Sequence, residues 1–138
     1  MILTDTGPLV ALADKNEPAH LRCVAATKTL PKSPLLTTWP CFTEAMYLLG
    51  KEGGYRAQQE LWQLRRRGFV VLHPLMEAEG NRMDALMQQY KDIPMDLADA
   101  SLVVVAETLN LSLVFTLDSH FSAYRLKNAG AFQVVPSF

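Results

Sequence analysis

The chain has little cysteine and no long apolar stretch, and both absences limit what it can be. Cys23 and Cys41 stand far apart, without the close spacing of a zinc motif or a redox pair. The histidines are equally scattered, at His20, His73 and His120. No apolar run approaches the ~20 residues of a membrane span, and the first residues lack the basic region of a signal peptide. We therefore expect a cytoplasmic protein with two reduced, buried cysteines.

Excess positive charge is also missing. The formal net charge is −1, which argues against binding polyanions through bulk charge. The only dense basic run is Arg65–Arg67. It is explained either as a helix C-terminus favoured by the macrodipole or as a patch that contacts phosphates. Any action on nucleic acid must therefore come from a local basic patch or from a bound metal.

Short apolar stretches alternate with helical patterns along the 138 residues, of which 49% are hydrophobic. The apolar stretches predict buried strands at Met1–Asp5, Leu35–Thr38, Phe69–Leu72, Leu113–Thr116 and Phe132–Val135. Helical spacing bounded by proline and glycine predicts helices at Leu9–Ala13, Ala19–Leu30, Pro40–Lys51, Tyr55–Arg67, Met76–Tyr90, from within 91–101 to about Leu109, and at Ser119–Lys127. The alternation predicts one α/β domain, residues 1–138, with a mostly parallel sheet flanked by helices.

Five acidic residues are predicted to meet at the carboxyl edge of that sheet. Asp5 ends the first strand, and Asp118 lies just past the fourth. Asp96 and Asp99 begin the helix that leads into the fourth strand, so this helix start lies at the same edge. Glu44 lies in the first turns of the helix after the second strand. Carboxylates this close repel one another unless a cation lies between them, and Mg²⁺ prefers oxygen ligands.

Each acid also has a purely structural explanation. Asp5, Asp96 and Asp118 could cap the helices that follow them, with Asp99 as a first-turn partner of Asp96. Glu44 could be a solvated helix residue. Capping alone does not require all the acids to share one edge of the sheet, so the joint pattern favours a metal site.

The residues at these positions resemble a known family. The matching segments are Asp5-Thr6-Gly7 after the first strand, Glu44, Asp96–Ala100, and Thr116–Phe121 with Tyr124-Arg125 beyond. In this order and spacing they resemble the PIN-domain ribonucleases, and among them the VapC-type toxins of toxin–antitoxin pairs. The resemblance covers essentially the whole chain.

The resemblance implies a PIN-like three-layer fold with a five-stranded sheet, and an endoribonuclease that depends on Mg²⁺ or Mn²⁺. It implies that Asp5, Glu44, Asp96 and Asp118 form the catalytic acids, with Asp99 as a further ligand. Thr6 and Thr116 would support them, and Arg125 is a candidate RNA contact. The resemblance also implies an antitoxin partner, which the apolar helices could accommodate in a groove, and a homodimer.

Three other interpretations remain open. A receiver domain or an aspartate-based phosphatase also gathers acids at a sheet edge, but Thr6-Gly7-Pro8 follows Asp5 where the phosphatases have a second acid. A catalytically silent binding domain would keep the acids only as caps. A housekeeping PIN nuclease would process RNA without an antitoxin.

Overall fold

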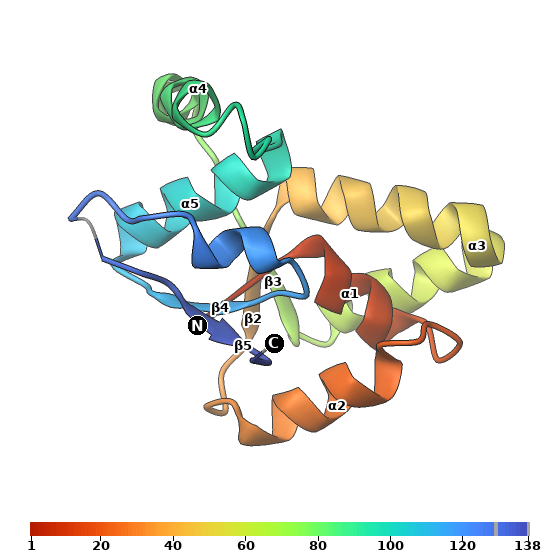
Figure 1. The fold of residues 1–138 in the computed structure, drawn as a ribbon. Helices are drawn as coiled ribbons and strands as arrows, with labels where there is room; N and C mark the ends of the chain where they lie inside the picture. The colour runs from red at the N-terminus through yellow and green to blue at the C-terminus, as the bar shows by residue number, and fades with distance from the viewer. Residues whose placement is uncertain (129, 138) are drawn as a thin grey trace.

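Five parallel strands form a single sheet in the order β3-β2-β1-β4-β5 (Figure 1). The computed structural model describes residues 1–128 and 130–137. The strands are β1 (Ile2–Thr4), β2 (Leu35–Thr38), β3 (Val70–His73), β4 (Leu113–Phe115) and β5 (Gln133–Val135). Leu3 of β1 pairs with Leu36 on one side and with Val114 on the other, which fixes the register of the central strands. The α/β class with a parallel sheet is confirmed.

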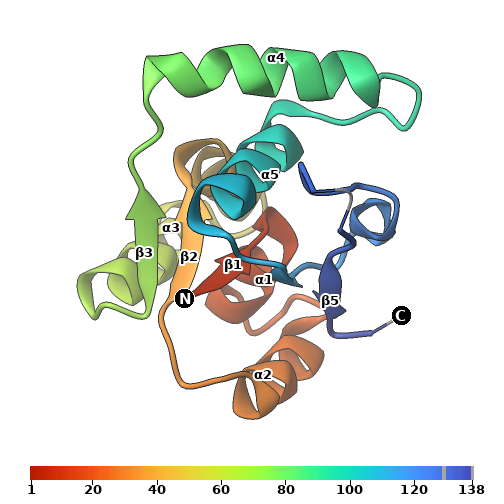
Figure 2. The same cartoon turned by 90° about the vertical axis from the view of Figure 1, so that its left-hand side faces the viewer.

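The helices form the outer layers of the fold. They are α1 (Thr6–Ala13), α2 (His20–Thr29), α3 (Trp39–Arg66), α4 (Gly80–Gln89) and α5 (Leu97–Leu109), with short 3₁₀ turns η1 (Glu77–Glu79) and η2 (Ser119–Ser122). The chain moves outward from β1 to β3 and then crosses back to β4. Right-handed crossovers in opposite directions place helices on opposite faces of a sheet. Accordingly, α5 and the pair α1 and α3 lie on opposite sides of the strands (Figure 2).

Helix α3 bends sharply at Gly54. The backbone there has φ 68° and ψ −161°, which is outside the helical region and costs glycine the least of all residues. Sequence spacing predicts two helices, Pro40–Lys51 and Tyr55–Arg67, and the bend lies between them. The bend carries the chain from the carboxyl edge of the sheet, where β2 ends, back to the start of β3.

Two predicted helices are shorter than expected. The predicted helix at Ser119–Lys127 is wrong beyond its first turn, because only Ser119–Ser122 forms a 3₁₀ turn. Arg125 then pairs with Ala131 in an antiparallel bridge, which draws the backbone out of helical geometry. The predicted helix Met76–Tyr90 is divided into the 3₁₀ turn η1 and the helix α4.

Helix α5 is the most buried helix of the fold. Every residue from Ala98 to Ala106 is buried, so the helix is enclosed on all sides rather than amphipathic. Its N-terminus brings Asp99 to the carboxyl edge of the sheet. In the described part of the chain, no helix is both long and apolar enough to cross a membrane.

Candidate active site

Asp5 occupies the carboxyl end of β1 and is the N-cap of α1. Its Oδ1 accepts a hydrogen bond from the Thr6 backbone N–H at 2.8 Å, and its Oδ2 accepts one from the Thr116 hydroxyl at 2.8 Å. The side chain is buried, and this burial raises its pKa to about 6, with the nearby carboxylates of Asp118 and Asp96 adding to the effect. Capping and a place in the acidic site are therefore compatible in this residue.

Asp99 is the second buried acid of the site. It lies in the first turn of α5 and is 5% exposed. Burial raises its pKa to about 8, and the charges of Asp5, Asp96 and Asp118 act in the same direction. Its Oδ2 accepts a hydrogen bond from the Tyr124 hydroxyl at 2.7 Å, which favours the charged form. Burial first, and the neighbouring carboxylates second, therefore make the charged form of Asp99 costly when no cation is bound.

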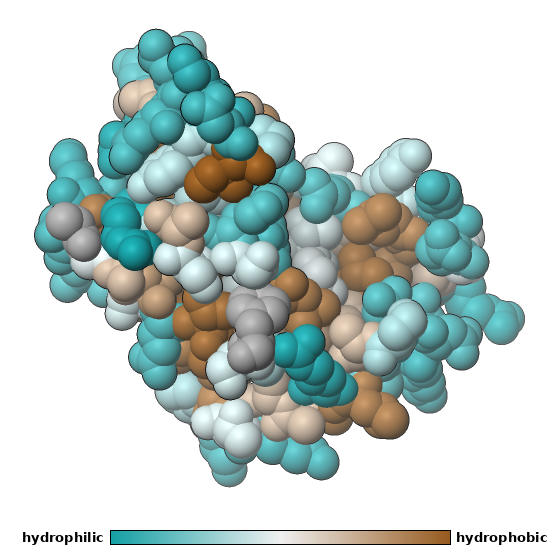
Figure 3. Space-filling model, viewed as in Figure 1, coloured by the Kyte–Doolittle hydropathy of each residue, from teal (hydrophilic) through white to brown (hydrophobic). Residues whose placement is uncertain are grey.

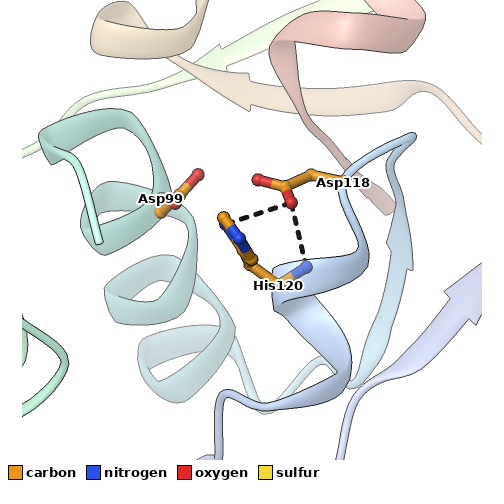
Figure 4. Close-up of side chains that lie close together, drawn as sticks. All are labelled: Asp99, Asp118 and His120. Atoms are coloured by element: carbon orange, nitrogen blue, oxygen red, sulfur yellow. Dashed lines mark hydrogen bonds and ion pairs between the residues drawn. The ribbon is translucent and has the colours of Figure 1, made fainter. Parts of the chain in front are cut away.

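Asp118, the N-cap of the turn η2, and His120, within that turn, face Asp99 (Figure 4). The Asp118 Oδ1 lies 3.2 Å from the His120 Nδ1 and accepts the His120 backbone N–H at 2.9 Å. One candidate ligand atom from each of these three residues lies within 4.8 Å of the other two. Two carboxylate oxygens and an imidazole nitrogen gathered in this way could hold a metal ion.

Asp96 and Glu44 stand at the solvent side of the same edge. Asp96 is exposed and is the N-cap of α5, since its Oδ1 accepts the Asp99 backbone N–H at 2.8 Å. Glu44 is exposed in the second turn of α3. Among the described residues, the three-atom group that could hold a metal includes Asp99 and Asp118 but not Asp5, Asp96 or Glu44.

The start of α3 is packed against the buried acids. Cys41 is fully buried, with its Sγ 3.9 Å from the Asp5 Oδ1 and 3.6 Å from the Ala98 carbonyl oxygen. Burial and the Asp5 charge raise the pKa of this thiol, so it stays protonated. The Thr6 hydroxyl donates to the Cys41 carbonyl at 3.4 Å. Cys41 therefore belongs to the wall of the site, which its isolation in the sequence did not indicate.

The basic residues considered as RNA contacts, Arg125 and Arg65–Arg67, lie in two different places. Arg125 follows the site residues Asp118 and His120 closely in the chain. Its guanidinium donates to the carbonyl oxygens of Ser122 at 2.8 Å and of Tyr124 at 2.9 Å. Arg65 and Arg66 form the last turn of α3, as the macrodipole explanation expects. Arg67 lines a pocket together with Ile2, Leu35 and Val70, which are the first residues of β1, β2 and β3. That end of the sheet is opposite to the acids.

Besides Cys41, two members of the site were not assigned a role from the sequence. His120 lies inside the segment Thr116–Phe121, two residues after Asp118, so the spacing could have suggested it. Tyr124 reaches Asp99 across 25 positions of sequence, and this contact has no local signal.

Comparison with known proteins identifies the family of this chain. Residues 2–127 match the family model described as PIN domain, and the chain belongs to this family. It is 29% identical to Ribonuclease VapC26 of Mycobacterium tuberculosis over 140 residues, covering 98% of this chain and 100% of that protein.

A solved structure shares the fold. It is described as the crystal structure of Mycobacterium tuberculosis VapC20, a toxin that cleaves the sarcin–ricin loop. It superposes with a TM-score of 0.81 and 18% identity, covering 89% of this chain and 94% of that one. The expected PIN-like fold is therefore confirmed.

Proposed function

We propose that the protein is a metal-dependent endoribonuclease that hydrolyses RNA phosphodiester bonds and acts as the toxin of a toxin–antitoxin pair. The observation that carries the proposal is the meeting of buried Asp5 and Asp99 with Asp118 and His120 at the carboxyl edge of a PIN-domain sheet. Similarity to a protein named Ribonuclease VapC26 supports the activity and the toxin class.

The carboxylates suit Mg²⁺ or Mn²⁺, with Asp99 and Asp118 as the central ligands and Asp5 and Asp96 beside them, and the His120 nitrogen favours Mn²⁺. A bound divalent ion would lower the pKa of a water and offset charge on the phosphate oxygens. Thr116 holds Asp5, and the Asp96 cap holds the start of α5, so both fix the positions of charged groups. Glu44, at the solvent side, is proposed to orient a water for attack on the phosphorus.

The acidic edge also sets a requirement for the substrate. An anionic RNA would be repelled by several carboxylates, so its phosphate must approach with a cation in place. Arg125, whose backbone N–H is bonded to the Tyr90 hydroxyl at 3.0 Å, is proposed to contact the RNA backbone beside the acids. Sequence selection in the RNA is left to the surrounding loops.

A protein partner is proposed from a pocket beside the acids. The pocket has a volume of about 450 Å³ and includes Gly7 and Leu117, which neighbour site residues. Its described lining includes three carboxylates, those of Asp14, Glu17 and Glu52, and contains no basic residue. Apolar surface also gathers over the region of α3 and α1 in Figure 3. An antitoxin segment with basic and apolar side chains fits this chemistry, and we propose a cytoplasmic homodimer as the form that it controls.

Co-expression tests the toxin assignment. Induced wild-type protein is expected to arrest growth, and the neighbouring reading frame is expected to relieve the arrest and to co-purify. Charge reversal by Glu17→Lys with Glu52→Lys should weaken this complex, whereas Glu60→Lys, an exposed acid elsewhere on α3, should not. Nuclease activity without growth arrest or a partner would instead indicate a housekeeping nuclease.

A further inference from the structure

Tyr124 is a buried tyrosine whose hydroxyl points at one acid of the site. Its side chain is fully buried, and its hydroxyl donates to the Asp99 Oδ2 at 2.7 Å. Its ring is held edge-on by Tyr90 at 5.0 Å and by Phe121 at 5.1 Å between ring centroids. The ring is therefore fixed by packing, and the hydroxyl is fixed with it.

The segment that carries Tyr124 also carries the opposite side of the site. Asp118 and His120 precede it, and the Tyr124 backbone N–H bonds to the His120 carbonyl oxygen at 3.3 Å. One short stretch of chain thus presents two candidate ligands and holds a third, Asp99, which comes from α5. A shift of this stretch relative to α5 would move both of its candidate ligands away from Asp99 and would pull on the Tyr124 hydrogen bond as well.

We propose that Tyr124 is a positioning residue that holds the Asp99 carboxylate in the orientation that binds the metal. This inference rests on the proposed function. A carboxylate has about four lone-pair sites on its two oxygens, and the hydroxyl takes one of them. The remaining sites then face the centre of the site in a fixed direction. Hydrogen bonds from outside the ligand set orient metal ligands in this way, and losing one typically weakens metal binding 10- to 100-fold.

The neighbouring tyrosine supplies a matched control. Tyr90 is part of the same aromatic cluster, but its hydroxyl accepts the Arg125 backbone N–H at 3.0 Å instead of contacting an acid. Tyr124→Phe and Tyr90→Phe each remove one hydroxyl and keep the ring. Only Tyr124→Phe removes a hydrogen bond to Asp99, whereas Tyr90→Phe removes a hydrogen bond to the Arg125 backbone.

The test measures binding of Mn²⁺ alone to the full chain by titration calorimetry, with thermal unfolding to confirm that both variants fold. We expect about 10- to 100-fold weaker Mn²⁺ binding in Tyr124→Phe and nearly wild-type binding in Tyr90→Phe. Equal affinities in the two folded variants would overturn the positioning role and leave the proposed function standing. Wild-type protein that binds no Mn²⁺ would overturn both.

A spectroscopic measurement keeps the test valid even if Tyr124→Phe folds poorly. Mn²⁺ bound at Asp99 should change the near-ultraviolet circular dichroism of the buried tyrosine in the wild-type protein and in Tyr90→Phe. The change should be lost in Asp99→Asn. A wild-type spectrum that is unchanged while calorimetry shows binding would contradict the proposal.

Discussion

The Thr116 hydroxyl donates a hydrogen bond to the Asp5 carboxylate at 2.8 Å and accepts one from the Asp118 backbone N–H at 2.9 Å. It therefore connects the ends of two adjacent strands, β1 and β4, through one oxygen atom. Each strand is followed by an acid of the proposed site, Asp5 directly after β1 and Asp118 three residues after β4. The spacing of these acids depends on this hydroxyl as well as on the sheet.

Thr116→Val should remove this connection while keeping the side-chain shape. We expect a loss of about 1–2 kcal/mol in the free energy of unfolding, because one buried and one partly buried hydrogen bond are broken, and a clear fall in metal-dependent cleavage. Thr37→Val is the matched control, since the Thr37 hydroxyl is also buried but bonds to the Thr4 carbonyl at 2.8 Å. If both variants lost cleavage equally, the effect would be one of general stability.

Asp5→Asn should stabilise the metal-free protein while it abolishes cleavage. Asp5 is buried with a pKa of about 6, so at pH 7.5 the fold holds a charge that burial and neighbouring carboxylates disfavour. We expect a gain of roughly 1 kcal/mol in unfolding free energy, the usual trade between stability and activity at a charged site. Thermal unfolding in a chelator measures it. A folded Asp5→Asn protein with full nuclease activity would refute the role of Asp5.

His120 should influence which metal the site prefers. Imidazole nitrogen favours transition metals over Mg²⁺, whereas carboxylate oxygens accept both. We expect His120→Ala to weaken Mn²⁺ binding about tenfold and Mg²⁺ binding much less. His73→Ala, a histidine whose ring lies 4.0 Å from Glu79, serves as the control. Unchanged Mn²⁺ affinity in His120→Ala would remove His120 from the ligand set.

The ion pair between α4 and α5 should affect stability but not chemistry. Arg82 bonds to both carboxylate oxygens of Glu107, at 2.9 and 3.0 Å, and the Glu107 side chain is 9% exposed. Arg82→Met would leave this carboxylate buried without a partner and should cost about 1–3 kcal/mol. Denaturant unfolding measures the loss. Cleavage per folded molecule should stay at the wild-type level, and a large fall would show that α4 shapes the site.

The sequence predicted the parallel sheet and its acidic edge because both depend on local patterns. Short apolar strands and the acids that follow them are visible without tertiary information, as Asp5 and Asp118 show. It did not show that Asp99 is more deeply buried than Asp96. The apolar run that follows them is buried on every side of α5. Its pattern therefore does not indicate which face of the helix points toward the core, and so which of the two acids is buried.

The helix predicted at Ser119–Lys127 failed for a related reason. Phe121 and Tyr124 are both buried at helical spacing, but a single 3₁₀ turn followed by an extended segment satisfies the same pattern. The distant pairing of Arg125 with Ala131 decides between them. Contacts of this kind, like that of Tyr124 with Asp99, arise only when separate segments pack together.

We propose that these carboxylates form a metal-dependent centre that cleaves RNA. The most direct test incubates purified wild-type protein and folded Asp99→Asn with total RNA, with Mn²⁺ or with a chelator, and maps the new 5′ ends. We expect discrete cleavage sites only for the wild-type protein with metal. Cleavage at the same sites by Asp99→Asn, or by the wild-type protein in chelator, would contradict the claim.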